Sequence, residues 1–120
     1  MALSRGNLGF STQVGAGVTS SVYTVGSAQT AYIKSVLLYN LSSTSTQNVQ
    51  IHVVGNSGGS VGTASSTTRV ARIGITADDT FFFEPAYPIT LTATNDTLQV
   101  YNEGTTANSV NVLVLGDKEV

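Results

Sequence analysis

The stretch AYIKSVLLYN (residues 31–40) decides the fold class of this 120-residue chain. It is long and strongly apolar, it contains β-branched and aromatic residues, and neither Gly nor Pro interrupts it, which is typical of a β-strand. Residues 42–46 are all Ser or Thr, and after them Val49, Ile51 and Val53 alternate with polar residues. The sequence therefore predicts a strand, a turn and a second strand with one apolar face.

Six more stretches are likewise rich in β-branched or other apolar residues, so about eight strands are predicted in all. They are residues 20–25, 68–76, 80–84, 89–93, 98–102 and 110–115. Ser and Thr together make 31 residues and only 10% of the chain is charged, so the residues that usually form surface helices are scarce. Short connections rich in Ser, Asn and Gly favour antiparallel pairing of these strands.

The sequence predicts an all-β fold, a single antiparallel β-sandwich or jelly roll with an extended N-terminal arm. Residues 31–120 form the predicted body, and residues 1–30, rich in Gly, Ser and Thr, form the arm. The candidate attachment residues of the arm are its larger apolar side chains, Leu3, Leu8, Phe10 and Val14. We expect the arm to gain order by adding to a sheet edge of its own body, of a neighbouring subunit or of a different protein.

Charge and composition argue against several kinds of function. The net charge is −2, so no basic excess is available to neutralise the phosphates of a nucleic acid. The first ten residues contain no secretory signal, and no apolar stretch is long enough to span a membrane, so we expect synthesis in the cytoplasm and no membrane partner. The chain has no Cys and one His, which leaves little material for a metal site, a cofactor or acid–base chemistry.

The candidate groups for catalysis each have a simpler explanation. His52 is expected on the polar face of its strand, in solvent, with no partner for catalysis suggested by spacing. Asp78 and Asp79 precede a strand, as turn residues do. Arg69 and Arg72 are three apart on one strand, so they are predicted to point to opposite faces, and one of them could pair with Glu84 or Asp79. We therefore expect no enzyme, no catalytic residue and no bound cofactor or metal.

Several strands carry apolar residues on both faces, although a small sandwich has only one core. In residues 31–40 alternation places Ile33 with Leu37 and Val36 with Leu38 on opposite faces. The candidate subunit or partner interface consists of Val36, Leu38, Phe82, Leu113 and Leu115. Two-sided apolar strands favour self-association, so we expect a homo-oligomer, with a trimer as the leading state. The alternative is that the arm folds back over one sheet.

Three stretches resemble small virion structural proteins of tailed bacteriophages. They are TAYIKSVLLYNLSSTSTQNVQIHVVG (residues 30–55), FFFEPAYPITLTATNDTLQVYNEG (81–104) and VNVLVLGDKEV (110–120). The resemblance implies a β-sandwich subunit of a virion, made in the host cytoplasm, with the major capsid protein or other virion proteins as partners. It implies first a capsid decoration (cement) protein that stabilises the shell, and alternatively a neck, tail or fibre component; no catalytic residues come with it.

A third function stays open from the residues themselves. Five Tyr and many hydroxyl side chains could line a carbohydrate groove, which would make the chain a carbohydrate-binding module.

Overall fold

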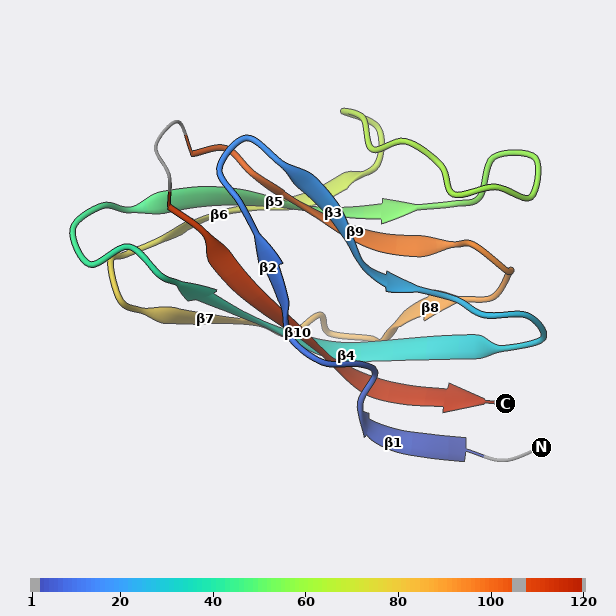
Figure 1. Ribbon diagram of the computed structural model, residues 1–120. Helices are drawn as coiled ribbons and strands as arrows, with labels where there is room; N and C mark the ends of the chain where they lie inside the picture. The colour runs from blue at the N-terminus through green and yellow to red at the C-terminus, as the bar shows by residue number, and fades with distance from the viewer. Residues whose placement is uncertain (1–2, 105–107, 120) are drawn as a thin grey trace.

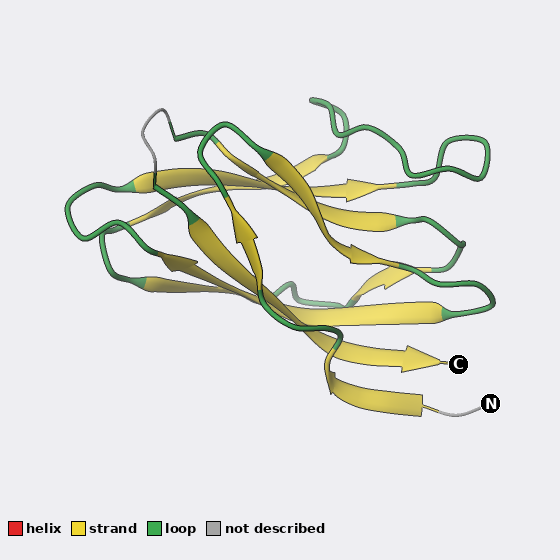
Figure 2. Ribbon diagram, viewed as in Figure 1, coloured by secondary structure: helices red, strands yellow, loops and turns green. Residues whose placement is uncertain are grey.

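The computed structural model describes residues 3–104 and 108–119, and within these ranges the protein consists of β-strands and loops with no helix (Figures 1 and 2). The strands are β1 (Leu3–Asn7), β2 (Thr12–Val14), β3 (Thr19–Thr24), β4 (Thr30–Asn40), β5 (Gln47–Val54), β6 (Arg69–Ile75), β7 (Thr80–Phe83), β8 (Ile89–Leu91), β9 (Thr97–Asn102) and β10 (Val110–Glu119). The all-β prediction is confirmed.

Two antiparallel sheets pack face to face, as Figure 1 shows. The first sheet has the order β1-β10-β4-β7, with β2 also paired to β10 and β8 also paired to β4. The second sheet has the order β3-β9-β5-β6. Because β1 and β2 share one position, as do β7 and β8, each sheet has four strand positions. This arrangement is an eight-position jelly roll, in agreement with the predicted fold class.

Most connections cross from one sheet to the other. β4 lies in the first sheet and β5 in the second, so the Ser/Thr stretch of residues 42–46 joins two layers and does not close a hairpin. The turn at Asn95, which has a φ of 69°, likewise leads from β8 in the first sheet to β9 in the second. Of the consecutive strands, β5 and β6 are paired with each other.

The N-terminal segment predicted as an arm lies along the edge of its own body. β1 and β2 pair with successive parts of β10, and β3 pairs with β9 in the second sheet. Leu8 and Val14 belong to the hydrophobic core, and Val14 is fully buried. Residues 3–24 therefore contribute strands to both layers of the sandwich.

The core fills the space between the sheets with aliphatic side chains. Its largest fully buried members are Ile33, Leu38, Ile51, Ile75 and Leu98. Each such side chain contributes about 1.5–3 kcal/mol on removal from water, so this layer is the main source of stability.

A β-bulge in β4 sets which side chains enter this core. β10 pairs Leu115 with Ser35 and Gly116 with Ile33, which leaves Lys34 without an opposite residue. The extra residue resets the alternation, so Ile33 and Val36 both point inward although they are three apart. A Cβ at Gly116 would collide with the carbonyl oxygen of Tyr32, so the bulge requires glycine there.

Candidate functional site

The outer side of the first sheet carries a row of apolar side chains. Leu37 on β4 lies opposite Leu113 on β10 and opposite Phe82 on β7, and residues directly opposite share a face. Phe82 is 58% exposed and the two leucines are partly exposed. Leu115 follows two residues along β10, on the same side. Phe10, in the β1–β2 connection, is 93% exposed.

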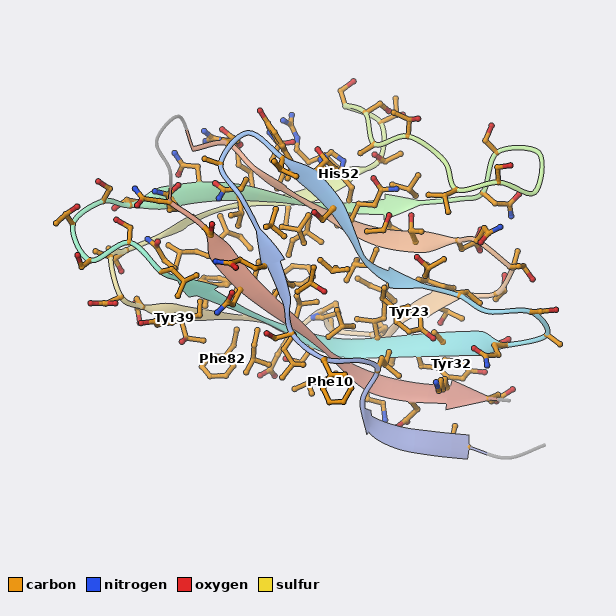
Figure 3. The ribbon with its side chains drawn as sticks, viewed as in Figure 1. Phe10, Tyr23, Tyr32, Tyr39, His52 and Phe82 are labelled. Atoms are coloured by element: carbon orange, nitrogen blue, oxygen red, sulfur yellow. The ribbon has the colours of Figure 1, made fainter. Side chains whose placement is uncertain are left out.

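Figure 3 shows Phe10 and Phe82 projecting from the side of the first sheet that faces away from the second. We call Phe10, Leu37, Phe82, Leu113 and Leu115 the apolar face. Aromatic residues with this much exposed area are uncommon on an isolated domain unless they meet a partner. The apolar face is therefore the first candidate for a functional surface.

The predicted interface residues divide between this surface and the core. Phe82, Leu113 and Leu115 lie on the apolar face, whereas Val36 and Leu38 are fully buried, so their assignment to an outer surface was wrong. The reason is the bulge at Lys34, which reverses the expected relation between Ile33 and Leu37. Alternation followed backward from Asn40 places Leu38 and Val36 inside and Leu37 outside, whereas alternation followed forward from Ile33 places Leu37 inside.

The candidate attachment residues of the arm also divide. Leu8 and Val14 are in the core, while Leu3 is 47% exposed and Phe10 stands almost free of the body. Of these residues only Phe10 is placed where it extends the apolar face.

Polar side chains bound the apolar face at one end. Lys34 Nζ and Asp117 Oδ2 are 2.7 Å apart, and the Tyr32 hydroxyl donates to Glu119 Oε1 at 3.0 Å. The hydrogen bond to Glu119 is the main reason that the pKa of Tyr32 is raised. Both charge signs occur here, so this end of the sheet presents no single-sign field to a second molecule.

The outer side of the second sheet is polar. The register aligns Thr19, Tyr101, Gln50 and Arg72 in one row across β3, β9, β5 and β6. We call this row, together with His52 and Glu103, the polar face. The outer side of the second sheet is thus polar, whereas that of the first sheet is apolar.

His52 is covered, contrary to the expectation of a solvent position. Its side chain is 4% exposed because the loop of residues 55–68 folds over this part of the sheet (Figure 3). Nδ1 lies 2.8 Å from Thr68 Oγ1, and Nε2 lies 3.0 Å from Gln50 Oε1. Burial lowers the pKa of His52, and the charge of Arg69 lowers it further. The ring is therefore favoured in its neutral form.

Glu103 connects the polar face into one network. Its carboxylate accepts from Gln50 Nε2 at 2.8 Å and from Arg72 through Nε at 2.8 Å and Nη2 at 2.9 Å. The hydrogen bonds from Arg72 and then Gln50 lower the pKa of Glu103, so the carboxylate is ionised. The predicted pairing of an arginine with Glu84 or Asp79 is thus replaced by a bidentate pair with Glu103.

The two arginines lie on the same face, not on opposite faces. β6 pairs Arg72 with Gln50 and Arg69 with His52, and the register shift between them leaves Val70 as an extra residue. This second bulge, like the one at Lys34, changes the face of a side chain in a way that spacing alone does not show.

A pocket of ≈ 290 Å³, open to solvent, lies between the loop of residues 55–68 and the polar face. Thr19, Gln50, His52 and Tyr101 line it from the sheet, and residues 64–66 line it from the loop. At its far end the loop is fixed by Asp96, whose Oδ1 accepts from the backbone N and from Nδ2 of Asn56 at 2.9 and 3.1 Å. The pocket is therefore framed by an anchored loop.

The acidic pair Asp78–Asp79 has local partners. The Tyr39 hydroxyl donates to Asp78 Oδ1 at 2.9 Å, and the backbone N of Thr80 donates to Asp79 Oδ1 at 2.9 Å. Within residues 3–104 and 108–119 no three His, Cys, Asp or Glu side chains are grouped as metal ligands would be. The same residues contain no helix that could cross a membrane.

Comparison with known proteins gives likenesses of structure at low identity. One is a chain from Bacillus endospore appendages, described as disulfide-linked pili, with a TM-score of 0.46 and 17% identity over 98% of this chain and 88% of that chain. Another is from infectious bursal disease virus, Gx strain, with a TM-score of 0.45 and 15% identity over 98% of this chain and 35% of the viral chain. The present chain thus spans about a third of that viral protein. No family model and no curated protein matches the sequence.

Proposed function

We propose that this chain is a structural subunit of a tailed-bacteriophage virion, and specifically a capsid decoration protein. The observation that carries the proposal is the apolar face, where Phe10 and Phe82 stand exposed beside three leucines. The resemblance of residues 30–55, 81–104 and 110–120 to small virion proteins supports the same role. In this role the chain binds copies of itself and the outer surface of the shell.

The size of the first sheet suits such contacts. Four strand positions about 4.8 Å apart, and a length of about ten residues at about 3.3 Å each, give a face of about 600 Å². A standard stable interface buries about 800 Å² on each partner, so Phe10 and the adjoining loops would have to supply the remaining area. Self-association through this face produces a small closed oligomer, with the trimer as the leading state.

A decoration protein stabilises the shell by mass action. Because it binds the assembled lattice and not the free capsid subunit, each bound copy shifts the equilibrium toward the assembled state. The low charge of the chain suits this role, since a charge of −2 gives little repulsion between neighbouring copies.

The test is to mix the full chain with undecorated shells, pellet the shells and measure the bound copies by quantitative mass spectrometry. A decoration protein saturates at a copy number comparable to that of the major capsid protein and raises the temperature at which the shells release DNA. Saturation at only a few copies per particle identifies a neck, tail or fibre component instead. Absence of binding to shells and to tails overturns the virion proposal.

A further inference from the structure

We propose that the polar face is a binding site for a neutral carbohydrate, seated in the pocket over Tyr101. The site lies on the second sheet, on the opposite side of the sandwich from the apolar face. It therefore does not depend on the virion role, and either proposal can fail without the other.

The pocket has the shape and size for a small ligand. Its volume of ≈ 290 Å³ is just below the range of about 300–1,000 Å³ for small-molecule sites, so it suits one or two sugar rings. Tyr101 and Gln50 line it from the sheet, and Ser65 and Ser66 line it from the loop. Because the pocket is open at the surface, a longer glycan could continue beyond it.

The polar side chains of the site are held in place before any ligand arrives. Gln50 is fixed from two sides, because Oε1 faces the buried ring of His52 and Nε2 donates to Glu103. Arg72 is fixed by two hydrogen bonds to the same carboxylate. Ordering a free surface side chain on binding lowers the affinity, and in this network the ordering is already present.

The network leaves part of the hydrogen-bonding capacity of Gln50, which lines the pocket, and of Arg72, its neighbour on β6, unused. Gln50 retains one N–H and one lone pair, and Arg72 retains the N–H groups of Nη1. The hydroxyl of Tyr101 makes no hydrogen bond to any residue that the structure describes. These donors and acceptors match the hydroxyl groups of a sugar, which both donate and accept, and the tyrosine ring offers an apolar surface for the C–H groups of the sugar.

The charge of the site favours a neutral ligand. Glu103 neutralises Arg72, and the pKa of His52 is lowered so that its ring adds no charge at neutral pH. Arg69, opposite His52 on β6, is the remaining cation beside the pocket. A strongly anionic ligand would be repelled by Glu103 and attracted by Arg69 alone. This attraction is too weak to offset the free energy the anion loses when it leaves water.

The experiment is a microarray of neutral and of sialylated oligosaccharides, probed with the labelled full chain and followed by calorimetric titration of the glycans retained. We expect neutral glycans to bind, Tyr101→Ala to weaken them at least tenfold, and Tyr101→Phe to fall between. Tyr87→Ala, at an 85% exposed tyrosine that belongs neither to the pocket nor to the apolar face, is the matched control and retains full binding. Circular dichroism checks the fold, and Gln50→Ala replaces Tyr101→Ala if that variant unfolds.

Three results would overturn this assignment. They are the absence of any retained glycan, retention of sialylated glycans alone, and equal affinity of the wild type and the folded Tyr101 or Gln50 variants.

Discussion

The ring of His52 donates a hydrogen bond from Nε2 to the side-chain oxygen of Gln50, across 3.0 Å and beneath the loop of residues 55–68. The direction of this bond follows from the next partner. Glu103 can only accept while ionised, so the amide nitrogen of Gln50 faces Glu103 and the amide oxygen is left for His52. The single histidine of the chain therefore orients Gln50 toward Glu103, a role that its place in the strand did not reveal.

Removal of this ring destabilises the protein. His52→Ala deletes two partly buried hydrogen bonds, to Gln50 and Thr68, and leaves space under the loop. We expect a loss of about 1–3 kcal/mol in the free energy of unfolding, measured by urea denaturation. A change within about 0.5 kcal/mol, the range of ordinary surface positions, would contradict the buried position of the ring.

Acid weakens the fold through the same residue. The pKa of His52 is lowered in the folded protein, so below the ordinary value of 6.5 the unfolded chain binds a proton that the folded chain does not. Stability is therefore fully present above pH 6.5 and is lost as the pH falls below it, by up to about 1.4 kcal/mol per pH unit. Arg69, opposite the ring, adds to the effect, while Glu103, whose own pKa is lowered, stays ionised in this window.

This pH effect is measured as a difference between two proteins. Urea denaturation of the wild type and of His52→Ala is carried out at about pH 7.5 and about pH 5. The other titrating groups are the same in both proteins, so the difference between them isolates the contribution of His52. The gap in stability between the two proteins narrows at the lower pH. A gap that stays constant or widens would show that the folded ring takes up the proton as readily as the unfolded chain does.

The apolar face is tested by introducing charge. Leu113→Lys places an ammonium group in the row formed with Leu37 and Phe82, beside Leu37, where a second molecule would have to desolvate it. We expect the oligomer to dissociate to a monomer of 12.4 kDa in sedimentation velocity, with an unchanged β-type circular dichroism spectrum. Val70→Lys, at the 54% exposed bulge residue of β6, is the control and keeps the wild-type mass.

Two results would contradict the assignment of the apolar face as an interface, each for a different reason. Unfolding of Leu113→Lys would mean that the side chain belongs to the core. A wild-type protein that stays at the mass of one chain at every concentration would mean that the face does not bind a second copy.

The glycine at the β10 bulge is a sensitive position. Gly116→Ala directs a methyl group into the carbonyl of Tyr32, which is backbone and cannot rotate away. We expect a loss of about 1–3 kcal/mol, because β10 and β4 must separate to admit the added carbon. Gly55→Ala is the matched control, since a Cβ there meets nothing within 4 Å, and thermal denaturation of the two variants compares them. Equal midpoints would mean that the bulge adapts without cost.

Sequence reasoning found the fold class because the alternation in residues 48–54 and the long apolar run of residues 31–40 are local signals. It anticipated that the N-terminal arm adds to a sheet edge, but it gave no bounds for β1 and β2, which are short and depend on β10 for their hydrogen bonds. It placed His52 on the correct face of β5 but in solvent, because nothing in the strand indicates that a loop returns to cover it. Neither bulge was found, since an unpaired residue is defined by the partner strand and not by its own neighbours.

The bulge at Lys34 also marks where the length of β4 can change. If Lys34 is deleted, Ile33 still faces inward, Ser35 faces outward and Val36 faces inward, so the strand becomes regular with both faces intact. Deletion of Leu37 shifts Ile33 and all earlier residues of the strand by one, and exchanges the sides on which they point. Thermal denaturation should therefore find the first deletion mild, apart from the loss of the exposed pair with Asp117, and the second severe. β4 can therefore lose one residue at this site, and related chains can be one residue shorter there while each remaining side chain keeps its side of the sheet.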